Sequence, residues 1–319
     1  MSHAESLSVA GAGFDRLEFH AMGTHCQVIF RAPSLKAREE FRRAAVAWVE
    51  DFEARYSRFR SDSLISKINA MAGREWVETD AEFESMLKLC DWFTWRTGGI
   101  FDASSLPIAR LWDYHAENPV IPQREEIALA LRLTGWNKIQ RRANAIFLPE
   151  IGMGIDLGGI GKEYAVDRVF EMSRQWVIED ICVDFGRDLR VRGAPPEGGE
   201  WRVGLEDPHD PQRCWGGIAV RDRAVATSGG YARTFVADGR SFTHILDPRT
   251  GWPVDNGCQS VSVVAPTCTE AGVLSTSAFI LGREHGLPLL EQAPHVEGCV
   301  WSRGALFQTR SFGRYAITG

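Results

Sequence analysis

The segment from Val225 to Pro253 restricts the fold of this chain more than any other. An apolar run leads into the small turn Ser228 to Gly230, and two extended segments then flank Asp238-Gly239. This dipeptide tolerates the positive φ angles that the tight turn of a β-hairpin requires. The segment therefore predicts a β-hairpin whose turn lies at Asp238-Gly239.

The returning strand of this hairpin, expected over Phe242 to Leu246, carries a single histidine. Side chains in a strand alternate between two faces, which places His244 on one face and Ile245 on the other. Two prolines and a glycine then fix the shape of the loop Asp247 to Pro253, so its polar side chains have little freedom. A histidine ahead of a stiff polar loop indicates a functional site. A lone strand histidine with a structural role fits this stretch equally well.

Helical and extended patterns are mixed along the rest of the chain. Apolar residues at helical spacing predict helices over residues 37–52, 63–69, 82–95 and 125–133 and from residue 161 onward. Thr267 to Glu270 matches a capping box, which predicts a further helix that ends near Leu281. Strands are expected within residues 16–31, 143–148, 181–193, 201–208, 259–265 and 299–309. Because no repeat, low-complexity tract or linker separates these elements, we expect a flexible extension over residues 1–15 and one domain over residues 16–319.

Charge and cysteine content argue against two classes of protein. The net charge is −6, and the basic residues are scattered rather than gathered in the stripe of a nucleic-acid-binding protein. The seven cysteines include no C-x-x-C pair, so neither a disulfide framework nor a zinc cluster is expected. The N-terminus has no basic start with an apolar segment behind it, and no stretch approaches the roughly 20 apolar residues of a membrane span. We therefore expect a cytoplasmic protein, or a periplasmic one if an export signal has been removed.

A second informative segment, Gly152 to Arg168, is rich in glycine at its start and has helical spacing from Gly161 onward. A glycine turn at a helix N-terminus offers free backbone N–H groups and the positive end of the helix dipole, to which a phosphate binds. The segment matches neither a P-loop nor the dinucleotide-binding fingerprint, so a phosphate site here would be of another kind. Glycines that only allow close helix packing are the alternative, although packing does not require the charges of Asp156 and Lys162.

Seven segments of the chain follow one another in an order that has a known counterpart. They are MGTHCQV, SRFRSDSLISKIN, FDASSLPIARLW, IDLGGIGKEYAVDR, VATSGGY, THILDPRTGWPV and TEAGVLSTSAFILG. In this order they resemble the motifs of the ApbE-type FAD:protein FMN transferases, and they span Met22 to Gly282. The resemblance implies an α+β fold with mixed and antiparallel sheets and packed helices, related to the T-fold. It also implies that FAD is cleaved at its pyrophosphate with a divalent cation, usually Mg²⁺, and that FMN is joined to a Thr or Ser of a target flavoprotein.

The resemblance also assigns roles to single residues. The residues that would surround FAD are Met22, Phe59, Ile100, Phe101, Asp102, Asp156, Lys162, Tyr231 and Ile245. Among them, Asp156 would accept a hydrogen bond from the flavin nucleotide, and Lys162 would contact a phosphate or the flavin. His244 would be the base that takes the proton of the target hydroxyl. The backbone carbonyl of Gly159 and the hydroxyl of Thr276 would be ligands of the metal ion.

Several positions depart from the pattern of this family. Where an acidic metal ligand is usual, in a sequence like A-D-A-L-S-T, this chain has Gly272. Mg²⁺ prefers hard oxygen ligands, so the loss of a carboxylate should cost about 10-fold or more in metal affinity or activity. Glu163 stands where glycine is usual, and Arg187 replaces the second glycine of the usual Gly-Gly-Asp. We consider Glu163 or Glu270 as a substitute ligand, and Arg187 as a source of positive charge.

Three functions are compatible with these residues. The first is an FMN transferase with an altered metal site. The second, favoured by Gly272, is a relative that binds FAD but has lost transfer and serves as a carrier, a regulator or a flavin-using enzyme. The third is a serine hydrolase, because Ala226 to Gly230 differs by one residue from G-x-S-x-G and is followed by Asp238 and His244. These hydrolase residues would all belong to one hairpin, whereas the partners of such a serine come from distant loops, which argues against the third function.

Overall fold

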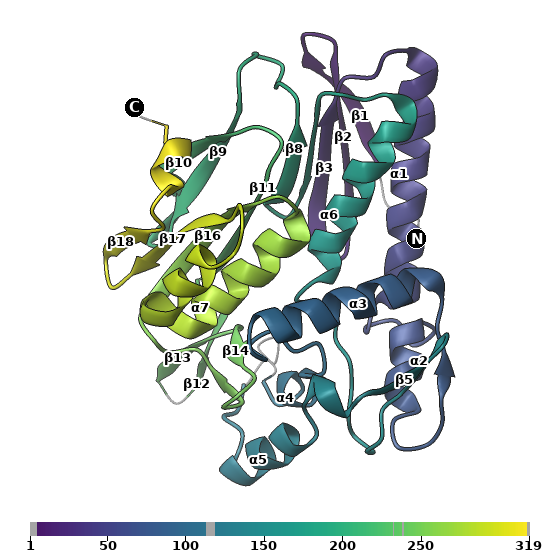
Figure 1. Cartoon of the computed structure of the whole chain (residues 1–319), viewed down its shortest axis with the longest axis vertical. Coiled ribbons are helices and arrows are strands. Elements are labelled where there is room, and N and C mark those ends of the chain that lie inside the picture. The colour runs from purple at the N-terminus through teal and green to yellow at the C-terminus, as the bar shows by residue number, and fades with distance from the viewer. Residues whose placement is uncertain (1–4, 113–118, 232, 238, 318–319) are drawn as a thin grey trace.

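A nine-stranded antiparallel sheet forms the centre of the molecule (Figure 1). The computed structural model describes residues 5–112, 119–231, 233–237 and 239–317. Neighbouring strands of this sheet all run antiparallel. In spatial order the strands are β1 (Ser6–Gly11), β2 (Phe14–Ala21), β3 (Thr24–Phe30), β7 (Ile181–Phe185), β8 (Asp188–Arg192), β11 (Ala224–Gly229), β16 (Cys258–Ala265), β17 (Glu297–Ser302) and β18 (Ala305–Gln308).

Three pairs of neighbouring strands are joined by two-residue turns of one kind. The turns are Met22-Gly23, Gly186-Arg187 and Arg303-Gly304, and all their residues have positive φ angles, between 51° and 76°. Positive φ at both positions is the mark of a type I′ turn, whose twist matches that of the strands it joins. Each turn lies inside a range over which strands were expected from the sequence, 16–31, 181–193 and 299–309.

Three long helices cover one face of the sheet: α1 (Leu35–Tyr56), α6 (Gly161–Met172) and α7 (Cys268–Glu291) (Figure 1). Helix α1 begins where the Ser34 hydroxyl accepts a hydrogen bond from the N–H of Ala37 at 3.1 Å. Its apolar stripe, which includes Phe41 and Phe52, is buried against the sheet and α6, as the spacing predicted. Helices packed on antiparallel strands confirm the predicted α+β class.

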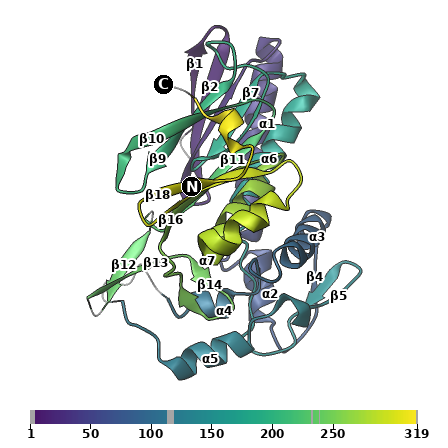
Figure 2. The ribbon, with the colours of Figure 1, turned by 60° about the vertical axis from the view of Figure 1, so that its left-hand side comes forward.

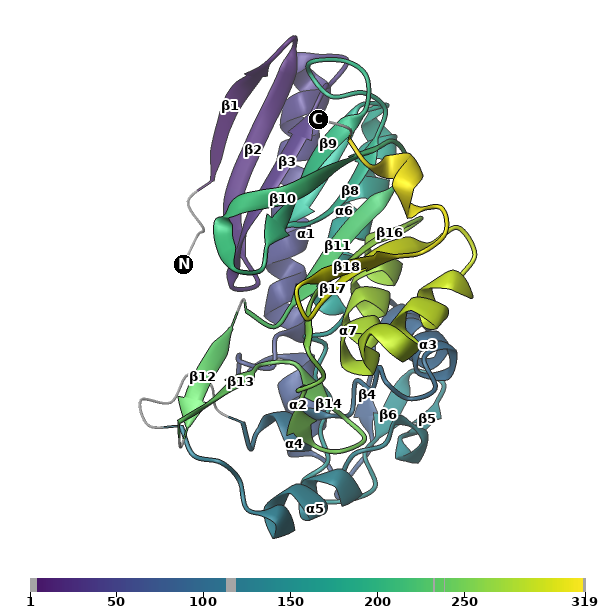
Figure 3. The same ribbon diagram turned by 90° about the vertical axis from the view of Figure 1, so that its left-hand side faces the viewer.

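The opposite face of the sheet is covered by a long hairpin of β9 (Trp201–Asp207) and β10 (Asp210–Val220) (Figure 3). Apolar side chains of the hairpin, such as Leu205 and Ile218, pack against Val191 and Val225 of the sheet. The sequence predicted β9 but gave no signal for β10. Register shifts between residues 210 and 216 interrupt the regular alternation on which such a signal depends.

Smaller elements lie at one end of the main sheet, beyond α7 (Figure 2). They are the helices α2 (Leu64–Ala70), α3 (Ala81–Arg96), α4 (Leu106–Ala109) and α5 (Arg124–Arg132), the 3₁₀ turn η1 (Trp136–Lys138), and the strands β4 (Val77–Glu78), β5 (Gln140–Arg142) and β6 (Ala145–Phe147). The 3₁₀ turns η2 (Ser173–Trp176) and η3 (Phe312–Tyr315) follow α6 and β18. The helices expected at 63–69, 82–95 and 125–133 are confirmed. Ser63, one of two expected caps, accepts the N–H of Ser66 at 3.0 Å.

Two short hairpins, made by β12 (Thr234–Ala237) with β13 (Arg240–Thr243) and by β14 (Leu246–Asp247) with β15 (Trp252–Pro253), contact this group of small elements. The rings of Phe235 and Phe242 stack with their centroids 5.2 Å apart, and both rings pack against Trp112. The predicted hairpin at Asp238-Gly239 is confirmed by the pairing of its strands. Asp238 itself lies outside the described residues.

The N-terminal residues do not form the flexible extension that was expected over 1–15. From Ser6 to Gly11 the chain forms β1, which pairs with β2 at the edge of the main sheet. Most of β1 is exposed, so burial imposes no alternation on its sequence that would predict a strand. Residues 1–4 lie outside the described part of the chain.

The continuous strand expected over Phe242 to Leu246 is wrong. Strand β13 ends at Thr243, and β14 begins only at Leu246. The reason is local: the N–H of Ile245 donates to the Thr243 hydroxyl at 3.4 Å. A side-chain hydroxyl that bonds a nearby backbone N–H competes with the strand ladder. The strand is therefore interrupted at His244 and Ile245, although Thr243 and Ile245 are both buried, as expected of side chains on one face.

Helix α7 contains a break near the predicted end at Leu281. Gly282 has φ 68° and ψ 179°, and the helix then continues to Glu291. The side-chain amide of Asn256 donates to the carbonyls of Phe279 and Ile280, at 3.0 and 3.1 Å. These bonds satisfy carbonyl groups that lose their helical partners at the break. No helix in the described part of the chain is long and apolar enough to cross a membrane.

Candidate functional site

The glycine-rich segment does lead into a helix N-terminus, that of α6. Helix α6 begins at Gly161, and its N-cap residue Ile160 has no side chain that can accept a hydrogen bond. Gly158 and Gly159, just before the cap, are exposed. By contrast, the carboxylate of Asp167 closes the N-terminus of α7, because it accepts the N–H groups of Cys268 and Thr269. Of these two helix starts, only that of α6 keeps the features of an anion site.

Asp156 holds the glycine turn and ties it to the segment after α1. Its Oδ1 accepts the N–H of Gly158 at 2.9 Å, and its Oδ2 pairs with Nε of Arg58 at 2.9 Å. The Arg58 guanidinium lies 4.1 Å from the ring centroid of Phe59, which is 80% exposed. An exposed aromatic ring held beside a guanidinium offers a flat surface on which a planar ligand can stack.

The residues Ile100 to Asp102 differ in what they can offer a ligand. Ile100 is buried, and Asp102 orders its own loop: Oδ1 accepts from the N–H and hydroxyl of Ser104, at 2.7 and 2.5 Å, and Oδ2 from the N–H of Trp136 at 3.2 Å. Phe101 is only partly buried, and its ring would be 3.6 Å from a Cβ placed on Gly159. Phe101 is thus the member of this group nearest to the glycine turn.

Lys162, Glu163 and Asp188 form a cluster of charges behind the first turn of α6. Lys162 Nζ bonds to the carboxylate of Asp188 and lies 3.1 Å from Oε1 of Glu163. Burial raises the pKa of Asp188 to about 7, although the ammonium of Lys162 opposes this shift. Burial disfavours the charge of Lys162, but the two carboxylates outweigh it and raise the pKa of Lys162. Lys162 is therefore a charged group held in place by two acids.

A group of hydroxyls links α7 to β11 at the expected metal ligand Thr276. The Ser228 Oγ lies 2.8 Å from the hydroxyls of both Ser275 and Thr276. Within the residues that the structure describes, no three His, Cys, Asp or Glu side chains gather as a metal cluster would. A cation near Thr276 would therefore depend on hydroxyl and backbone oxygens together with fewer than three acidic groups.

His244 lies between the two short hairpins. Its Nδ1 is 3.1 Å from the carbonyl oxygen of Arg233, which can only accept, so Nδ1 carries the proton in the neutral ring. Burial lowers the pKa of His244 below its ordinary value, although the bond to that carbonyl opposes the shift. The imidazole is thus neutral near pH 7, with Nε2 as the atom that takes up a proton. These are the properties of a base.

Tyr231, Arg187 and Glu206 meet beside the turn that follows β11. The Tyr231 hydroxyl donates to Oε2 of Glu206 at 3.3 Å, and Glu206 also pairs with Arg187. The Tyr231 ring covers Gly229, where a Cβ would approach it to 2.6 Å. The turn at Met22 lies next to this cluster, because the N–H of Gly186 donates to the carbonyl of His25 at 2.9 Å. Met22 and Tyr231 are thus both placed around the β7–β8 turn.

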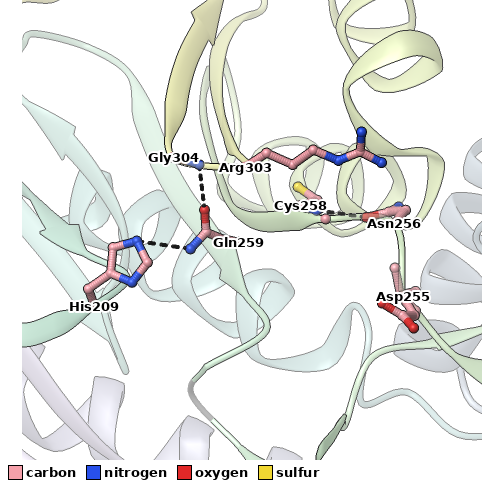
Figure 4. Close-up of a pocket in the computed structure, with 9 residues that line it drawn as sticks. His209, Asp255, Asn256, Cys258, Gln259, Arg303 and Gly304 are labelled. Atoms are coloured by element: carbon pink, nitrogen blue, oxygen red, sulfur yellow. Dashed lines mark hydrogen bonds between the residues drawn. The ribbon is translucent and has the colours of Figure 1, made fainter.

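One hollow of the described surface contains none of the expected site residues. Its volume is about 490 Å³, and Figure 4 shows its polar side chains. Gln259 joins the two sides of the hollow, because its amide bonds to His209 at 3.0 Å and to the N–H of Gly304 at 3.2 Å. The lining residues are His209, Val254, Asp255, Asn256, Gly257, Cys258, Gln259, Arg303 and Gly304. Because none of the residues expected to bind FAD or the metal lines this hollow, we do not include it in the site at α6.

The geometry does not favour a serine hydrolase. Ser228 lies within β11 rather than on a sharp turn between a strand and a helix. Its hydroxyl bonds to Ser275 and Thr276, whereas the imidazole of His244 faces the carbonyl of Arg233. Asp238, the third candidate, lies outside the described residues. The pair that would activate the serine is therefore not assembled.

Comparison with known proteins identifies the family of this chain. The ApbE family pattern matches residues 22–300. An FAD:protein FMN transferase of Treponema pallidum (strain Nichols) is 32% identical over 254 residues, which cover 75% of this chain and 70% of that protein. One of Klebsiella pneumoniae (strain 342) is 30% identical over 241 residues, covering 75% and 74%. The crystal structure of the ApbE protein from Thermotoga maritima has a TM-score of 0.87 at 30% identity, covering 96% of this chain and all of that one. This chain belongs to the ApbE family.

Membership in the ApbE family confirms the resemblance that the seven motifs carried, and with it the transferase class. One departure from the family pattern now has a structural description. Arg187 occupies the second position of a type I′ turn with φ 73°, where glycine is relaxed and an arginine is strained. Its side chain pairs with Glu206.

Sequence reasoning missed three residues of this site. They are Arg58, which holds Asp156, Asp188, which holds Lys162, and Glu206, which holds Tyr231 and Arg187. Arg58 directly precedes Phe59, an expected FAD contact, in one of the seven motifs. A basic residue in that position was therefore the available signal for Arg58. Asp188 is the acid of Gly186-Arg187-Asp188, which stands where the family has Gly-Gly-Asp, and this pattern was the available signal for it. Glu206 acts through partners far away in the sequence, and no local pattern marks it.

Proposed function

We propose that this chain is an FAD:protein FMN transferase that joins FMN to a Thr or Ser of a target flavoprotein. The main support for this proposal is the N-terminus of α6, where no side chain caps the backbone N–H groups. It combines exposed glycines with the charge of Lys162 and the Arg58–Phe59 pair, which suits a ligand that has both phosphates and a planar ring. The names of the relatives from Treponema pallidum and Klebsiella pneumoniae support the same reaction.

The reaction requires one bond to form and one to break at the FMN phosphorus. The hydroxyl oxygen of the target Thr or Ser attacks that phosphorus, the bond to the bridging oxygen of the pyrophosphate breaks, and AMP leaves. His244 takes the hydroxyl proton on Nε2, because its Nδ1 is already bonded to the carbonyl of Arg233. Lys162 and the first turn of α6 hold the phosphates, and Asp156 receives a donor group of the flavin nucleotide.

The residues of this chain fit a divalent cation beside the pyrophosphate. Thr276 offers a hydroxyl and Gly159 a backbone carbonyl, which are hard oxygen ligands. In addition, Oε2 of Glu163 is buried without a hydrogen-bond partner, as expected of an atom whose partner is an ion. When bound, Mg²⁺ would neutralise charge on the phosphates during transfer. Gly272 cannot contribute the acidic ligand that is usual in the family, so the metal site is altered.

Mass spectrometry of a flavinylation mixture tests the proposal. The mixture contains the purified chain, FAD, Mg²⁺ or Mn²⁺, and an acceptor fragment that bears the target motif of the family. We expect the acceptor to gain the mass of FMN less one water, and we expect no gain on a control acceptor whose target residue is replaced by alanine. An unmodified acceptor after long incubation with excess FAD would contradict transfer.

A second function is favoured by one observation, the glycine at position 272. A relative that binds FAD but no longer transfers FMN would leave the acceptor unmodified and still retain flavin. Equilibrium dialysis of the same chain with FAD separates this case from a chain that binds no flavin. In that case the protein would serve as a flavin carrier, a regulator or a flavin-using enzyme.

A further inference from the structure

Glu163 occupies the space that a side chain at position 272 would need. A Cβ placed on Gly272 would lie 2.5 Å from Cγ and 3.0 Å from Cδ of Glu163. Real Cβ atoms do not approach other carbons so closely, so position 272 must be glycine for Glu163 to adopt this position. The two departures from the family pattern, an acid where glycine is usual and a glycine where an acid is usual, are therefore in direct contact across α6 and α7.

The carboxylate of Glu163 is buried and only partly satisfied. Its residue is 7% exposed, Oε1 lies 3.1 Å from Lys162 Nζ, and Oε2 has no hydrogen-bond partner. A buried carboxylate oxygen without a partner is costly, and such atoms are rare unless a ligand or ion completes them. Lys162 also serves Asp188, so one ammonium faces two carboxylates.

Glu270, the other acid considered as a substitute, lies in a different environment. It belongs to the first turn of α7, and the charged groups around it are those of Arg96, Asp167 and His295. None of these belongs to the glycine turn or to the hydroxyl group at Thr276. Only Glu163 combines contact with Gly272 and an unpartnered buried oxygen.

We propose that Glu163 has taken over, from α6, the acidic metal ligand that α7 lacks at Gly272, so that its Oε2 binds a divalent cation between these helices. The exchange keeps the number of carboxylates at the site and moves one of them from one helix to its neighbour. The proposal rests on the proposed function for the identity of the site, but it concerns binding of the cation alone. In this proposal Glu163 supplies the acidic ligand of the altered metal site.

Binding of Mn²⁺ to the full chain, followed by the electron paramagnetic resonance signal of free Mn²⁺, tests this ligand directly. The titration is made with and without FAD on the parent, Glu163→Gln, Gly272→Asp, and the double variant Glu163→Ala with Gly272→Asp. We expect Glu163→Gln to weaken Mn²⁺ binding about 10-fold or more, since a metal ligand is lost while the shape is kept. Glu270→Gln is the matched control, which removes the same charge and should bind Mn²⁺ as the parent does.

The double variant separates a ligand from a merely structural acid. Alanine removes the Cγ that would collide with an aspartate at 272, so we expect Mn²⁺ affinity to return to within a few-fold of the parent. Gly272→Asp alone keeps the collision, so its melting temperature should fall below that of the double variant. Parent-like binding by Glu163→Gln, weaker binding by Glu270→Gln instead, or no Mn²⁺ binding by the parent would each overturn the proposal. Because the readout is binding, a chain that holds Mn²⁺ through Glu163 without transferring FMN would contradict only the proposed function.

Discussion

His244 owes its chemistry to two features of its surroundings, the carbonyl of Arg233 on Nδ1 and the burial that lowers its pKa. A histidine with a lowered pKa is more than half neutral at pH 6.5 and becomes mostly protonated only at lower pH. Because the neutral ring is the base, we expect the rate of FMN transfer to fall as the pH is lowered, with a midpoint below pH 6.5. Single-turnover rates at saturating FAD on both sides of this midpoint measure the profile.

A matched variant assigns the acidic limb of this profile. His244→Gln should lower the rate by about 10²- to 10⁴-fold, the usual contribution of a general base, and should remove the limb. A limb whose midpoint lies at or above pH 6.5 in the parent, or one that persists in the variant, would mean that another group titrates. The positive charge of Arg233 also disfavours the protonated ring, so it lowers the expected midpoint further.

The site depends on the N-termini of two neighbouring helices, α6 and α7. These N-termini differ in whether an acidic side chain accepts their backbone N–H groups. Asp167 of α6 accepts the N–H groups of Cys268 and Thr269 and also pairs with Arg190 at 2.9 Å. It therefore fixes α7, and with it Gly272 and Thr276, against α6. The start of α6 has no such cap, which leaves it for a ligand.

Removing the Asp167 carboxylate should loosen the pair of helices. We expect Asp167→Ala to lower the free energy of unfolding by about 2–4 kcal/mol, because its hydrogen bonds to two N–H groups of α7 and its pairing with Arg190 are lost together. Asp167→Asn, which keeps an acceptor oxygen, should lose less. Urea denaturation of both variants and the parent measures this difference. Equal stability of the alanine variant and the parent would show that Asp167 does not hold the helices.

For the whole molecule, sequence patterns predicted what is local and missed what is distant. The stripe of α1, the hairpin at Asp238-Gly239 and the start of α6 follow from patterns within a few residues, and the structure confirms them. The contact of Glu163 with Gly272 and the pairing of Arg58 with Asp156 join residues that are far apart along the chain. Periodicity carries no information about such pairs, because it records which face is buried but not what covers it.

The hairpin residues of the site are held to the rest of the molecule by one cluster around Trp112. Its indole N–H donates to the carbonyl of Gly251 at 2.8 Å, and its ring packs with Phe235, Phe242 and Trp252. This cluster fixes both short hairpins, and His244 lies between them. The position of the proposed base is therefore set by a tryptophan more than one hundred residues away in the sequence.

Two substitutions of Trp112 separate its hydrogen bond from its packing. Trp112→Phe leaves the carbonyl of Gly251 unpaired and should lower the free energy of unfolding by about 1–3 kcal/mol, while Trp112→Ala also opens a cavity and should cost about 3–5 kcal/mol. Trp95→Phe, at a position 71% exposed, is the control and should change stability by less than about 0.5 kcal/mol. Thermal and urea unfolding measure all three. If Trp112→Ala unfolded like the control, the cluster would not hold the hairpins, and the position of His244 would not depend on Trp112.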